Sequence, residues 1–560
     1  MIKRLTALLA VTVALTLAPT RASAQQIEVE EFTLDNGMTF LLYPRDEQPN
    51  NIAAGWVAKV GSVNERPGIT GISHFFEHMM FKGTDTVGTD EPKKDAEFRR
   101  KQQRVRQRML DLVYNDTEKL REVRSELQTL MDEQKEQTIV KNEFDRLYTN
   151  DGGSGMNAFT TNDHTFYFIN VPSNKFELWA WMESDRLTDS VFREFYAERD
   201  VVHEERRLRT ESTPTGKFDE QFNSMFWTSA PYSWPVIGWP SDLNSYTMEQ
   251  AQNYYDTYYQ PANLVGVVVG DFDPEQIKPV IESYFGRMSP GSGEVPPVAT
   301  LEVDQLAEKR MNAEVDAQPQ VKIRYHAVPW NHKDSFALEM LSNIMNGRTG
   351  RLYKSMVEGE EIATSASAMV SSAALGAPAK YDGYFEFNAT TKGDATPEDL
   401  EQAWYEQIKR LQDELVPDRE LQKVKNNVAA NAFRRLGSNF FLLVQIGLFE
   451  SLGEWEYINY GPKKLQAVTA EDIKRVANEY FDTENRAVAA YTRKEGSAQE
   501  EVDPEWAAVE EALGPQRAGM FKQQINQIKQ LTDTDMLQQM VDQGQNQLGR
   551  VPAEMRAAVE

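Results

Sequence analysis

The sequence predicts an α+β protein that contains two related units, and three observations lead to this fold class. The chain has 560 residues, which is too long for one ordinary hydrophobic core. Residues 289–297, SPGSGEVPP, have the Pro, Gly and Ser content of a linker between domains. On its two sides, the stretch from Thr247 (TMEQAQNYYDTYYQPANLVGVVV) is similar to the stretch from Thr469 (TAEDIKRVANEYFDTENRAVAAY). Each copy is typical of a helix that runs into an apolar strand, so the repeat indicates two copies of an α/β unit of roughly 200 residues.

Residues 1–24 are typical of a secretory signal peptide. A basic start, MIKR, precedes an apolar run over residues 5–17 and the small-residue cleavage site Ala22-Ser23-Ala24. A membrane anchor is the alternative, but this run is shorter than the ~18 residues that a span requires. We therefore expect an exported chain without a membrane span that begins near Gln25.

Composition limits the partners and the sources of stability. The chain contains no cysteine, so disulfides cannot stabilise it and a packed core must do so. The formal net charge is −26, and loss of Lys3, Arg4 and Arg21 with the signal peptide would make it −29. This excess of negative charge argues against nucleic acid or an anionic membrane as a partner.

The first unit is expected to open with strands. Residues 26–62 contain two alternating runs joined at Asn36-Gly37, a pair that favours a tight hairpin turn. A short helix should follow over residues 71–84. Residues 91–146 are charge-rich, lack Gly and Pro over most of their length and carry apolar residues at helical spacing, which predicts a helical hairpin broken near Asn115-Asp116.

A Gly-rich turn, DGGSG, then leads into a predicted strand over residues 156–171. Residues 497–560 are polar and Gln-rich, and an amphipathic helix is expected over residues 521–548. The predicted division is a signal peptide (1–24), a first domain (25–290) with the hairpin at about 91–146, a linker (291–300), a second domain (301–496) and a helical C-terminal tail (497–560).

The segment GISHFFEHMMFKGT, residues 71–84, places His74, Glu77 and His78 within five positions of an otherwise apolar helix. Because the histidines are four residues apart, their imidazoles lie on one face, one turn apart, where one helix can give two nitrogens to a zinc ion. Glu77 points beside such an ion and can take a proton from a bound water. This His-x-x-Glu-His order is the reverse of the commoner His-Glu-x-x-His. Two half-buried histidines on a core helix are the alternative.

A zinc ion that keeps a position open for water needs a third protein ligand. Residues 194–212 offer Glu198, Glu204 and Glu205 on one predicted helix. Since a helix turns ~100° per residue, Glu198 and Glu205 fall within about 20° of one face, whereas Glu204 points ~100° away and is expected to be solvated. One of the aligned pair can bind the metal while the other supports it. Spacing alone does not decide which of the two binds the metal. The alternative is that this segment is an ordinary charged helix without a metal ligand.

Three motifs in this order resemble the pitrilysin/insulinase family of zinc peptidases, which includes the mitochondrial processing peptidases and many bacterial periplasmic members. They are HFFEH from His74, Gly152-Gly153 followed by Asn157-Ala158-x-Thr160, and ERDV-x-x-x-E from Glu198 to Glu205. The likeness runs from about Glu28 to Lys494. It implies two homologous mixed-sheet units closing around a peptide-sized chamber, with the second unit free of metal.

The resemblance also implies the roles of the site residues. His74, His78 and Glu205 would bind one Zn²⁺ per chain, Glu77 would be the catalytic base, and Glu198 would support the ligands. Asn157 and Ala158 match a substrate-binding edge strand beside the metal, where a peptide backbone adds as an extra strand. From the residues alone, Asn157 is better explained as a turn residue after Gly153 and Gly155.

The second half departs from the family. If Gly347 is set against Gly83, the ligand positions become Leu338, Leu341 and Ser342, which cannot hold zinc. Active members or their partner subunits carry an Arg and a Tyr shortly downstream, which contact substrate and developing negative charge. Here Val357 and Thr364 stand in those places. The resemblance therefore implies the zinc-bearing half of a heterodimer with a metal-free homologous chain, although a homodimer is also open.

Together these features predict a zinc-dependent endopeptidase that hydrolyses extended or unfolded peptides in the periplasm of a Gram-negative bacterium. The alternative from another functional class is a non-catalytic peptide-binding or scaffold subunit of the same family. A structural coiled-coil protein, suggested by residues 91–146, would leave most of the chain unexplained.

Overall fold

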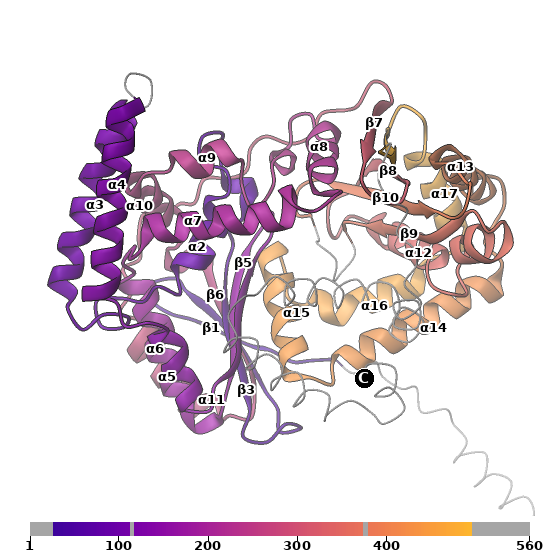
Figure 1. The fold of residues 1–560 in the computed structure, drawn as a ribbon. Coiled ribbons are helices and arrows are strands. Elements are labelled where there is room, and N and C mark those ends of the chain that lie inside the picture. Colours follow the sequence, from indigo (N-terminus) through magenta and orange to yellow (C-terminus); the bar gives the residue numbers. More distant parts are fainter. Residues whose placement is uncertain (1–25, 113–116, 373–378, 495–560) are drawn as a thin grey trace, which may run out of the picture. The chain divides into compact units, whose positions relative to one another are not determined.

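Two mixed β-sheets carry the fold, one from each half of the chain (Figure 1). The structure is a computed structural model that describes residues 26–112, 117–372 and 379–494. The first sheet has the order β1-β2-β6-β3-β5-β4. Its strands are β1 (Glu30–Thr33), β2 (Thr39–Pro44), β3 (Ile52–Ala58), β4 (Ser154–Thr160), β5 (Thr165–Val171) and β6 (Leu264–Gly270). Only β2 and β6 run parallel; the other neighbours are antiparallel.

The second sheet repeats this topology. Its strands are β7 (Lys309–Val315), β8 (Gln320–Ala327), β9 (Ala363–Val370), β10 (Gly383–Thr391) and β11 (Arg486–Arg493), in the order β7-β11-β8-β10-β9. The parallel pair, β7 and β11, occupies the place of β2 and β6. The predicted α+β fold with two related mixed sheets is therefore confirmed.

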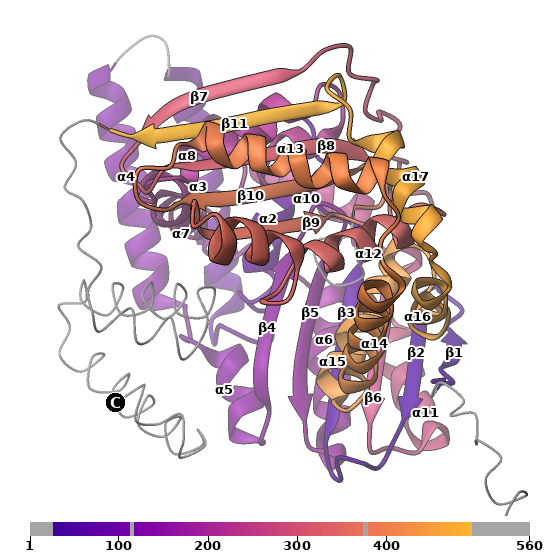
Figure 2. The same cartoon turned by 90° about the vertical axis from the view of Figure 1, so that its right-hand side faces the viewer.

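Helices follow the same order in both halves. Between β5 and β6 lie α6 (Phe176–Thr188), α7 (Phe195–Arg206), α8 (Gly216–Phe226), α9 (Pro240–Ser245) and α10 (Met248–Tyr258). Between β10 and β11 lie α13 (Pro397–Asp413), α14 (Asp418–Arg435), α15 (Asn439–Leu452), α16 (Tyr457–Ala467) and α17 (Ala470–Tyr480). Likewise α2 (Ile72–Met79) follows β3 and α12 (Ser335–Met345) follows β8, while α11 (Pro274–Phe285) follows β6. Figure 2 shows α12 and α13 packed over the second sheet, with α13 running along the strands β8 and β10.

Residues that are identical at matching positions of the internal repeat make the same contacts in both copies. Thr247 caps α10 by accepting a hydrogen bond from the backbone of Gln250, and Thr469 caps α17 in the same way. The Asn263 amide donates to the Tyr258 carbonyl at 2.8 Å, and the Asn485 amide donates to the Tyr480 carbonyl at 2.8 Å. Each asparagine thus ties the end of its helix to the strand that follows.

Of two turns in the first half, one agrees with the sequence prediction and the other divides a predicted strand. The Asn36-Gly37 hairpin between β1 and β2 is confirmed, with Gly37 at φ +94° in the region that favours glycine. The single strand expected over residues 156–171 is instead two antiparallel strands, β4 and β5. The chain turns at residues 161–164 because the Thr161 hydroxyl accepts hydrogen bonds from the backbone of Asp163 and His164, both at 3.2 Å.

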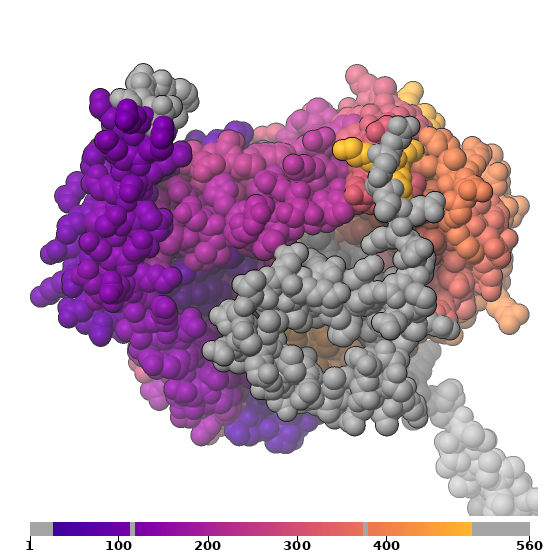
Figure 3. Space-filling view, in the orientation of Figure 1, coloured from indigo at the N-terminus to yellow at the C-terminus, as the bar shows by residue number. Residues whose placement is uncertain are grey.

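The charged segment of the first half forms three helices, α3 (Pro92–Leu112), α4 (Thr117–Gln137) and α5 (Glu143–Asn150). Helices α3 and α4 lie side by side and are exposed in the space-filling view (Figures 1 and 3). Helices α2 and α12 begin 263 positions apart, but β4 and β9 begin only 209 apart. The excess length of the first half therefore falls between α2 and β4, as expected for a segment inserted there.

Each half also covers one face of the other half's sheet. Leu442, Leu443 and Ile446 of α15 are fully buried against apolar residues of β3 and β6. A Cβ on Gly447 would come within 2.8 Å of the Phe166 ring, so glycine allows this close approach. Conversely, Phe222 and Phe226 of α8 belong to a buried cluster that includes residues of β7 and β11 of the second sheet. Since α8 and α15 are equivalent in order, the exchange is reciprocal.

Several predictions concern residues outside the described ranges. These are the signal peptide, the hairpin break near Asn115-Asp116 and the helical C-terminal tail. Among the described helices, none is both long and apolar enough to cross a bilayer. The domain boundaries proposed from composition stay a prediction.

Candidate metal centre

Helix α2 begins at a glycine and a buried carboxylate. Gly71 precedes it at φ +86°, and a Cβ there would lie 2.5 Å from the Ile237 carbonyl oxygen, so only glycine fits. The Glu65 carboxylate accepts hydrogen bonds from the backbone of Gly71 at 2.7 Å and of Ser73 at 2.8 Å. These bonds satisfy donors that have no partner inside a helix at its first turn, and they set where the helix starts.

The apolar residues of α2 determine which way the histidines face. Phe75, Phe76 and Met79 are almost completely buried in the core under the first sheet. At helical spacing, His74 and His78 then lie on the face turned toward α7. The aromatic residues that flank the histidines therefore hold the helix in one rotation about its axis.

The three predicted ligands converge from these two helices. His74 Nε2 lies 3.7 Å from Glu205 Oε2, and His78 Nε2 lies 3.3 Å from the same oxygen. One ligand atom from each of the three side chains lies within 4.8 Å of the others. Over the described ranges, no second cluster of three or more His, Cys, Asp or Glu meets this condition.

The three side chains of this cluster differ in protonation at neutral pH, and a metal ion would have to displace a proton from His78. Burial lowers the pKa of His74 to about 4, although the Glu205 charge opposes it, so this ring is neutral at pH 7. Burial also acts to lower the pKa of His78, but hydrogen bonds with Glu198 and Glu205 raise it to about 9. For Glu205, burial acts to raise the pKa, yet the His78 hydrogen bond and the His74 interaction lower it below its usual value. The carboxylate is therefore charged at neutral pH.

Glu198, the other aligned carboxylate, holds His78 from behind. Its Oε1 lies 2.8 Å from His78 Nδ1, and its Oε2 lies 2.5 Å from the ammonium nitrogen of Lys82. Lys82 also lies 3.5 Å from Glu194. Burial acts to raise the pKa of Glu198, but the contacts with His78 and Lys82 outweigh burial and lower the pKa below its usual value. Glu198 thus orients the His78 ring so that Nε2 points toward Glu205.

Glu77 lies next to the cluster and is held by the edge strand. The Thr160 hydroxyl, at the end of β4, donates to Glu77 Oε2 at 2.6 Å. Burial raises the pKa of Glu77, and the Thr160 hydrogen bond offsets part of that rise. A carboxylate with a raised pKa beside a metal cluster can act as a general base.

Strand β4 is at the edge of the first sheet, and Asn157 and Ala158 lie on it. Asn157 is exposed and its side-chain oxygen accepts from the Ala158 backbone at 2.9 Å. The pairing with β5 is irregular between Ser154 and Asn157, where Gly155 has φ +66°. Asn157 is therefore a strand residue and not the turn residue that composition suggested.

The end of α7 continues into a π-helical turn, residues Arg207–Glu211. Arg209 in this turn lies 2.7 Å from Glu205 Oε1, which leaves Glu205 Oε2 directed at the histidines. Glu204 points away, is exposed and pairs with Arg207 at 2.9 Å. Such π-helical turns occur frequently at functional sites.

The loop after α2 is fixed by a buried arginine. Arg193, just before α7, donates to the carbonyl oxygens of Lys82 at 2.7 Å, Thr84 at 2.7 Å and Val87 at 3.0 Å. Its Nε lies 3.2 Å from Asp95 of α3, which is completely buried. The inserted hairpin therefore contributes a charge that holds the loop carrying Lys82.

The donor set fits a zinc ion. Two imidazole nitrogens and one carboxylate oxygen are one of the three-ligand sets found in catalytic zinc sites. Glu205 Oε2 is buried and forms no well-aligned hydrogen bond within the described chain. It faces His78 Nε2 at 3.3 Å and His74 Nε2 at 3.7 Å, and a cation between these three atoms would satisfy it. The remaining nitrogen of His78 is paired with Glu198, whereas that of His74 is buried without a partner in the same residues.

The equivalent helix of the second half has no such set. Leu338 and Leu341 of α12 are fully buried in the second core, and the Ser342 hydroxyl donates to the Ala368 carbonyl at 3.0 Å. Val357 packs partly against that core, and Thr364 is exposed at the start of β9. Neither position offers a cation or a phenol.

Sequence reasoning missed the residues that act on the ligands through others. Lys82, Thr160, Arg193 and Asp95 were not singled out for such roles. Thr160 belongs to the Asn157-Ala158-x-Thr160 motif, but the sequence did not indicate that its hydroxyl contacts Glu77. The contacts of Arg193 and Asp95 span about a hundred positions of sequence, and no local pattern signals them.

Comparisons with known proteins match two separate stretches of the chain. The model of the insulinase family (peptidase family M16) matches residues 41–97, and that of the peptidase M16 inactive domain matches residues 245–428. The zinc protease PqqE of Helicobacter pylori is 25% identical over 497 residues, covering 87% of this chain and 98% of the relative.

Solved structures share the fold. A protease from Helicobacter pylori has a TM-score of 0.69 at 22% identity, covering 84% of this chain and all of the other. The periplasmic protease PqqL from Escherichia coli has a TM-score of 0.63 at 18% identity, covering 86% of this chain but 50% of the other. The fold seen here is thus about half of that longer chain.

Replacing Lys82 tests how the ligand helix is held. We expect Lys82→Met to lower the affinity for zinc by about ten- to a hundredfold, because Glu198 loses a partner and His78 becomes less well oriented. Competition with a chelator measures this affinity directly. Lys82 and Lys135 line the same surface pocket, but Lys135 has no carboxylate contact among the described residues. Lys135→Met is therefore a matched control. Equal affinities for the two variants would refute the role of Lys82.

Proposed function

Because the chain belongs to the insulinase family of peptidases (family M16), we propose that it is a zinc-dependent endopeptidase. His74, His78 and Glu205 would hold one zinc ion per chain. The observation that carries the proposal is the convergence of one atom from each of these side chains, with Glu77 beside them.

Each residue of the centre has a defined task in peptide hydrolysis. Zinc bound there would polarise the scissile carbonyl and lower the pKa of a water molecule. Glu77 takes a proton from the attacking water and delivers it to the leaving amine, so the C–N bond breaks and one water is consumed. Thr160 holds Glu77 in place at 2.6 Å, and Glu198 and Lys82 keep His78 oriented.

The substrate class follows from the edge strand. Strand β4 ends at Thr160, which contacts the general base, and Asn157 is exposed on the same strand. An extended peptide that pairs with this edge would place its backbone beside Glu77. Pairing through the backbone selects for extension rather than for one side-chain sequence. We therefore infer that extended or unfolded peptides are the substrates.

Glu77→Gln tests the chemistry without removing a ligand. We expect the variant to bind zinc as the unaltered chain does but to hydrolyse an unfolded protein at least about a hundredfold more slowly, since no group accepts the proton. Zinc content and hydrolysis are measured on the same preparation. The matched control, Glu204→Gln, changes an exposed glutamate that points away from the cluster and should leave both unchanged. Hydrolysis that survives Glu77→Gln would exclude this mechanism, and zinc without any turnover in a complete complex would favour the scaffold alternative.

We further propose that this chain is the catalytic subunit of a heterodimer. Val357 and Thr364 stand where the resemblance leads us to expect an arginine and a tyrosine. Without them, the chain offers no cation or phenol at those positions to stabilise negative charge on the peptide oxygen. The match to half of the PqqL chain supports a second, homologous half, here as a separate metal-free chain.

Reconstitution tests this assembly. We expect the purified chain alone to hydrolyse an unfolded protein at least tenfold more slowly than a mixture with its metal-free homologue, because one such interaction contributes about that much to a rate. Size-exclusion chromatography should show a complex in the mixture. Full activity of the isolated chain, unchanged by any homologue, would disprove the heterodimer.

We also propose that the protein acts in the periplasm. The first residues have the pattern of a signal peptide, and the relative in fold PqqL is a periplasmic protease. Cell fractionation should place the chain in the periplasmic extract with a mature N-terminus near Gln25. Recovery in the cytoplasm with residues 1–24 intact would be incompatible with this location.

A further inference from the structure

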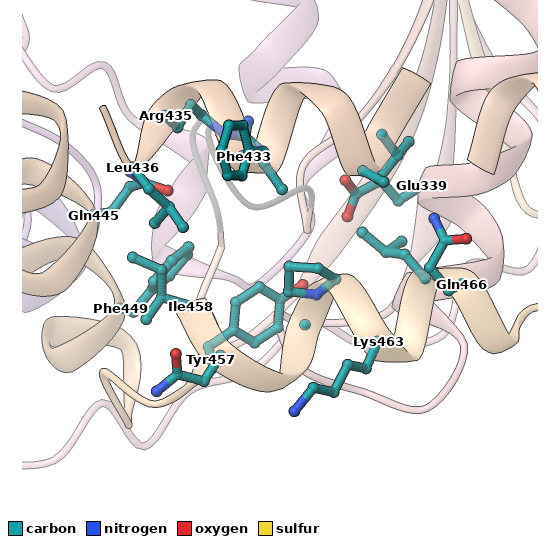
Figure 4. A pocket seen from close by; sticks show the side chains of 17 residues that line it. Glu339, Phe433, Arg435, Leu436, Gln445, Phe449, Tyr457, Ile458, Lys463 and Gln466 are labelled. Atoms are coloured by element: carbon teal, nitrogen blue, oxygen red, sulfur yellow. The ribbon is translucent and has the colours of Figure 1, made fainter. Parts of the chain in front are cut away.

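The second half contains a cavity of about 400 Å³ that the proposed peptidase chemistry does not use (Figure 4). Helices α14, α15 and α16 surround it, and Glu339 of α12 contributes its carboxylate at one side. Its volume is within the range of about 300–1,000 Å³ that small-molecule sites occupy. No residue of the metal cluster lines it.

The position of the cavity is related to the metal centre by the internal repeat. Helices α12 and α14 are the equivalents of α2 and α7, and α16 is the equivalent of α9. In the first half, the α2–α7 pair brings ligands together. In the second half, the same pair has no ligands, and an open space lies beside it.

The walls of the cavity are mainly apolar. Val428, Leu436, Phe449 and Tyr457 line it, and Figure 4 shows the Tyr457 ring beside the open space. Phe433 also lines it and is 66% exposed, which is unusual for a phenylalanine. An apolar group that enters the cavity would cover this ring and gain the free energy of removing both surfaces from water.

One cationic side chain in the cavity has an unused hydrogen-bond donor. Arg435 Nε is buried and has no hydrogen-bond partner in the part of the chain that the structure describes. Burial lowers the pKa of Arg435, and the negative charge of Glu339 does not fully offset this effect. A partly buried cation whose charge is incompletely offset is stabilised by an anion that hydrogen-bonds it.

The other polar groups leave Arg435 as the site for a ligand. The Asn459 amide already exchanges hydrogen bonds with the backbone of Ile27 at 2.9 and 2.8 Å, and the Gln466 amide donates to the Lys425 carbonyl at 2.7 Å. The charged lining residues are Arg435, Lys463 and Glu339, so two cations face one carboxylate. This net charge of +1 in the cavity lining favours the binding of a singly charged anion.

We propose that this cavity binds the apolar carboxyl-terminal residue of a peptide. The carboxylate pairs with the Arg435 guanidinium, and the apolar side chain lies against Phe433, Phe449 and Tyr457. The choice of a peptide as the bearer of the carboxylate rests on the proposed function, whereas the preference for an apolar anion rests on the cavity alone. Binding there would hold a substrate or product by its end, away from the metal centre.

Isothermal titration calorimetry of the full chain tests the site. The chain carries Glu77→Gln, so no turnover intervenes and the result does not depend on whether the protein is a peptidase. The probes are the acetylated tripeptide glycyl-glycyl-phenylalanine, the same peptide with a terminal carboxamide, and 3-phenylpropionate. We expect the free acid to bind at least about tenfold tighter than the carboxamide, because only the carboxylate forms a charge-assisted bond with Arg435.

Variants assign the effect to the cavity. In Arg435→Gln the acid and the carboxamide should bind equally weakly, whereas Arg434→Gln, which changes an exposed neighbour that does not line the cavity, should keep the difference. Ala432→Leu retains Arg435 but fills the space, so both peptides should bind at least tenfold more weakly. A thermal melt verifies that each variant is folded.

The outcomes are distinct. Equal affinity for acid and carboxamide in the starting protein, or a difference that persists in Arg435→Gln, would overturn the proposal, as would the absence of binding by every probe. If 3-phenylpropionate binds as tightly as the tripeptide, the cavity is a site for small apolar acids and the peptide assignment is wrong.

Discussion

The contact between α2 and α7 is the constraint on which the proposed metal centre depends. Two histidines come from one helix and two carboxylates from the other, so the set exists only while these helices keep one distance and one rotation. Phe75 sets the rotation from within the core, where it packs edge-on against Phe195 of α7 at 4.9 Å between ring centroids. The His78–Glu198 hydrogen bond at 2.8 Å then links the polar faces. The favourable free energy of this apolar packing thus offsets the desolvation cost of bringing charged groups together in a partly buried site.

The internal repeat contains the same helix pair twice, as α2–α7 and as α12–α14, and the two copies differ in the side chains that they bring together. The two halves have equivalent strands and helices, and each sends one helix, α8 or α15, onto the other's sheet. This exchange makes each half part of the other's core, so neither sheet is covered by its own helices alone. In the α12–α14 pair, Leu338 and Ser342 stand in the places of the two histidines and Leu341 in that of Glu77, and a cavity lies beside the pair.

The inserted helices are joined to the centre and are not simply an appendage. Asp95 of α3 is completely buried, pairs with Arg193 and accepts a hydrogen bond from Gln134 of α4 at 2.7 Å. Arg193 in turn holds the loop that carries Lys82. The base of the hairpin therefore has a structural role in positioning the residues around Glu198.

The sequence by itself determined the elements whose signals are local. Apolar periodicity, the Asn36-Gly37 turn, the capping threonines at 247 and 469 and the four-residue spacing of His74 and His78 each act over a few positions, where backbone geometry dictates the outcome. The tertiary structure decided the rest. It directed Glu205 to the rings and Glu198 behind His78, split residues 156–171 into two strands, and joined Asp95 to Arg193. These contacts depend on how cores pack and on which buried charges must find partners, and a single sequence carries no local signal for either.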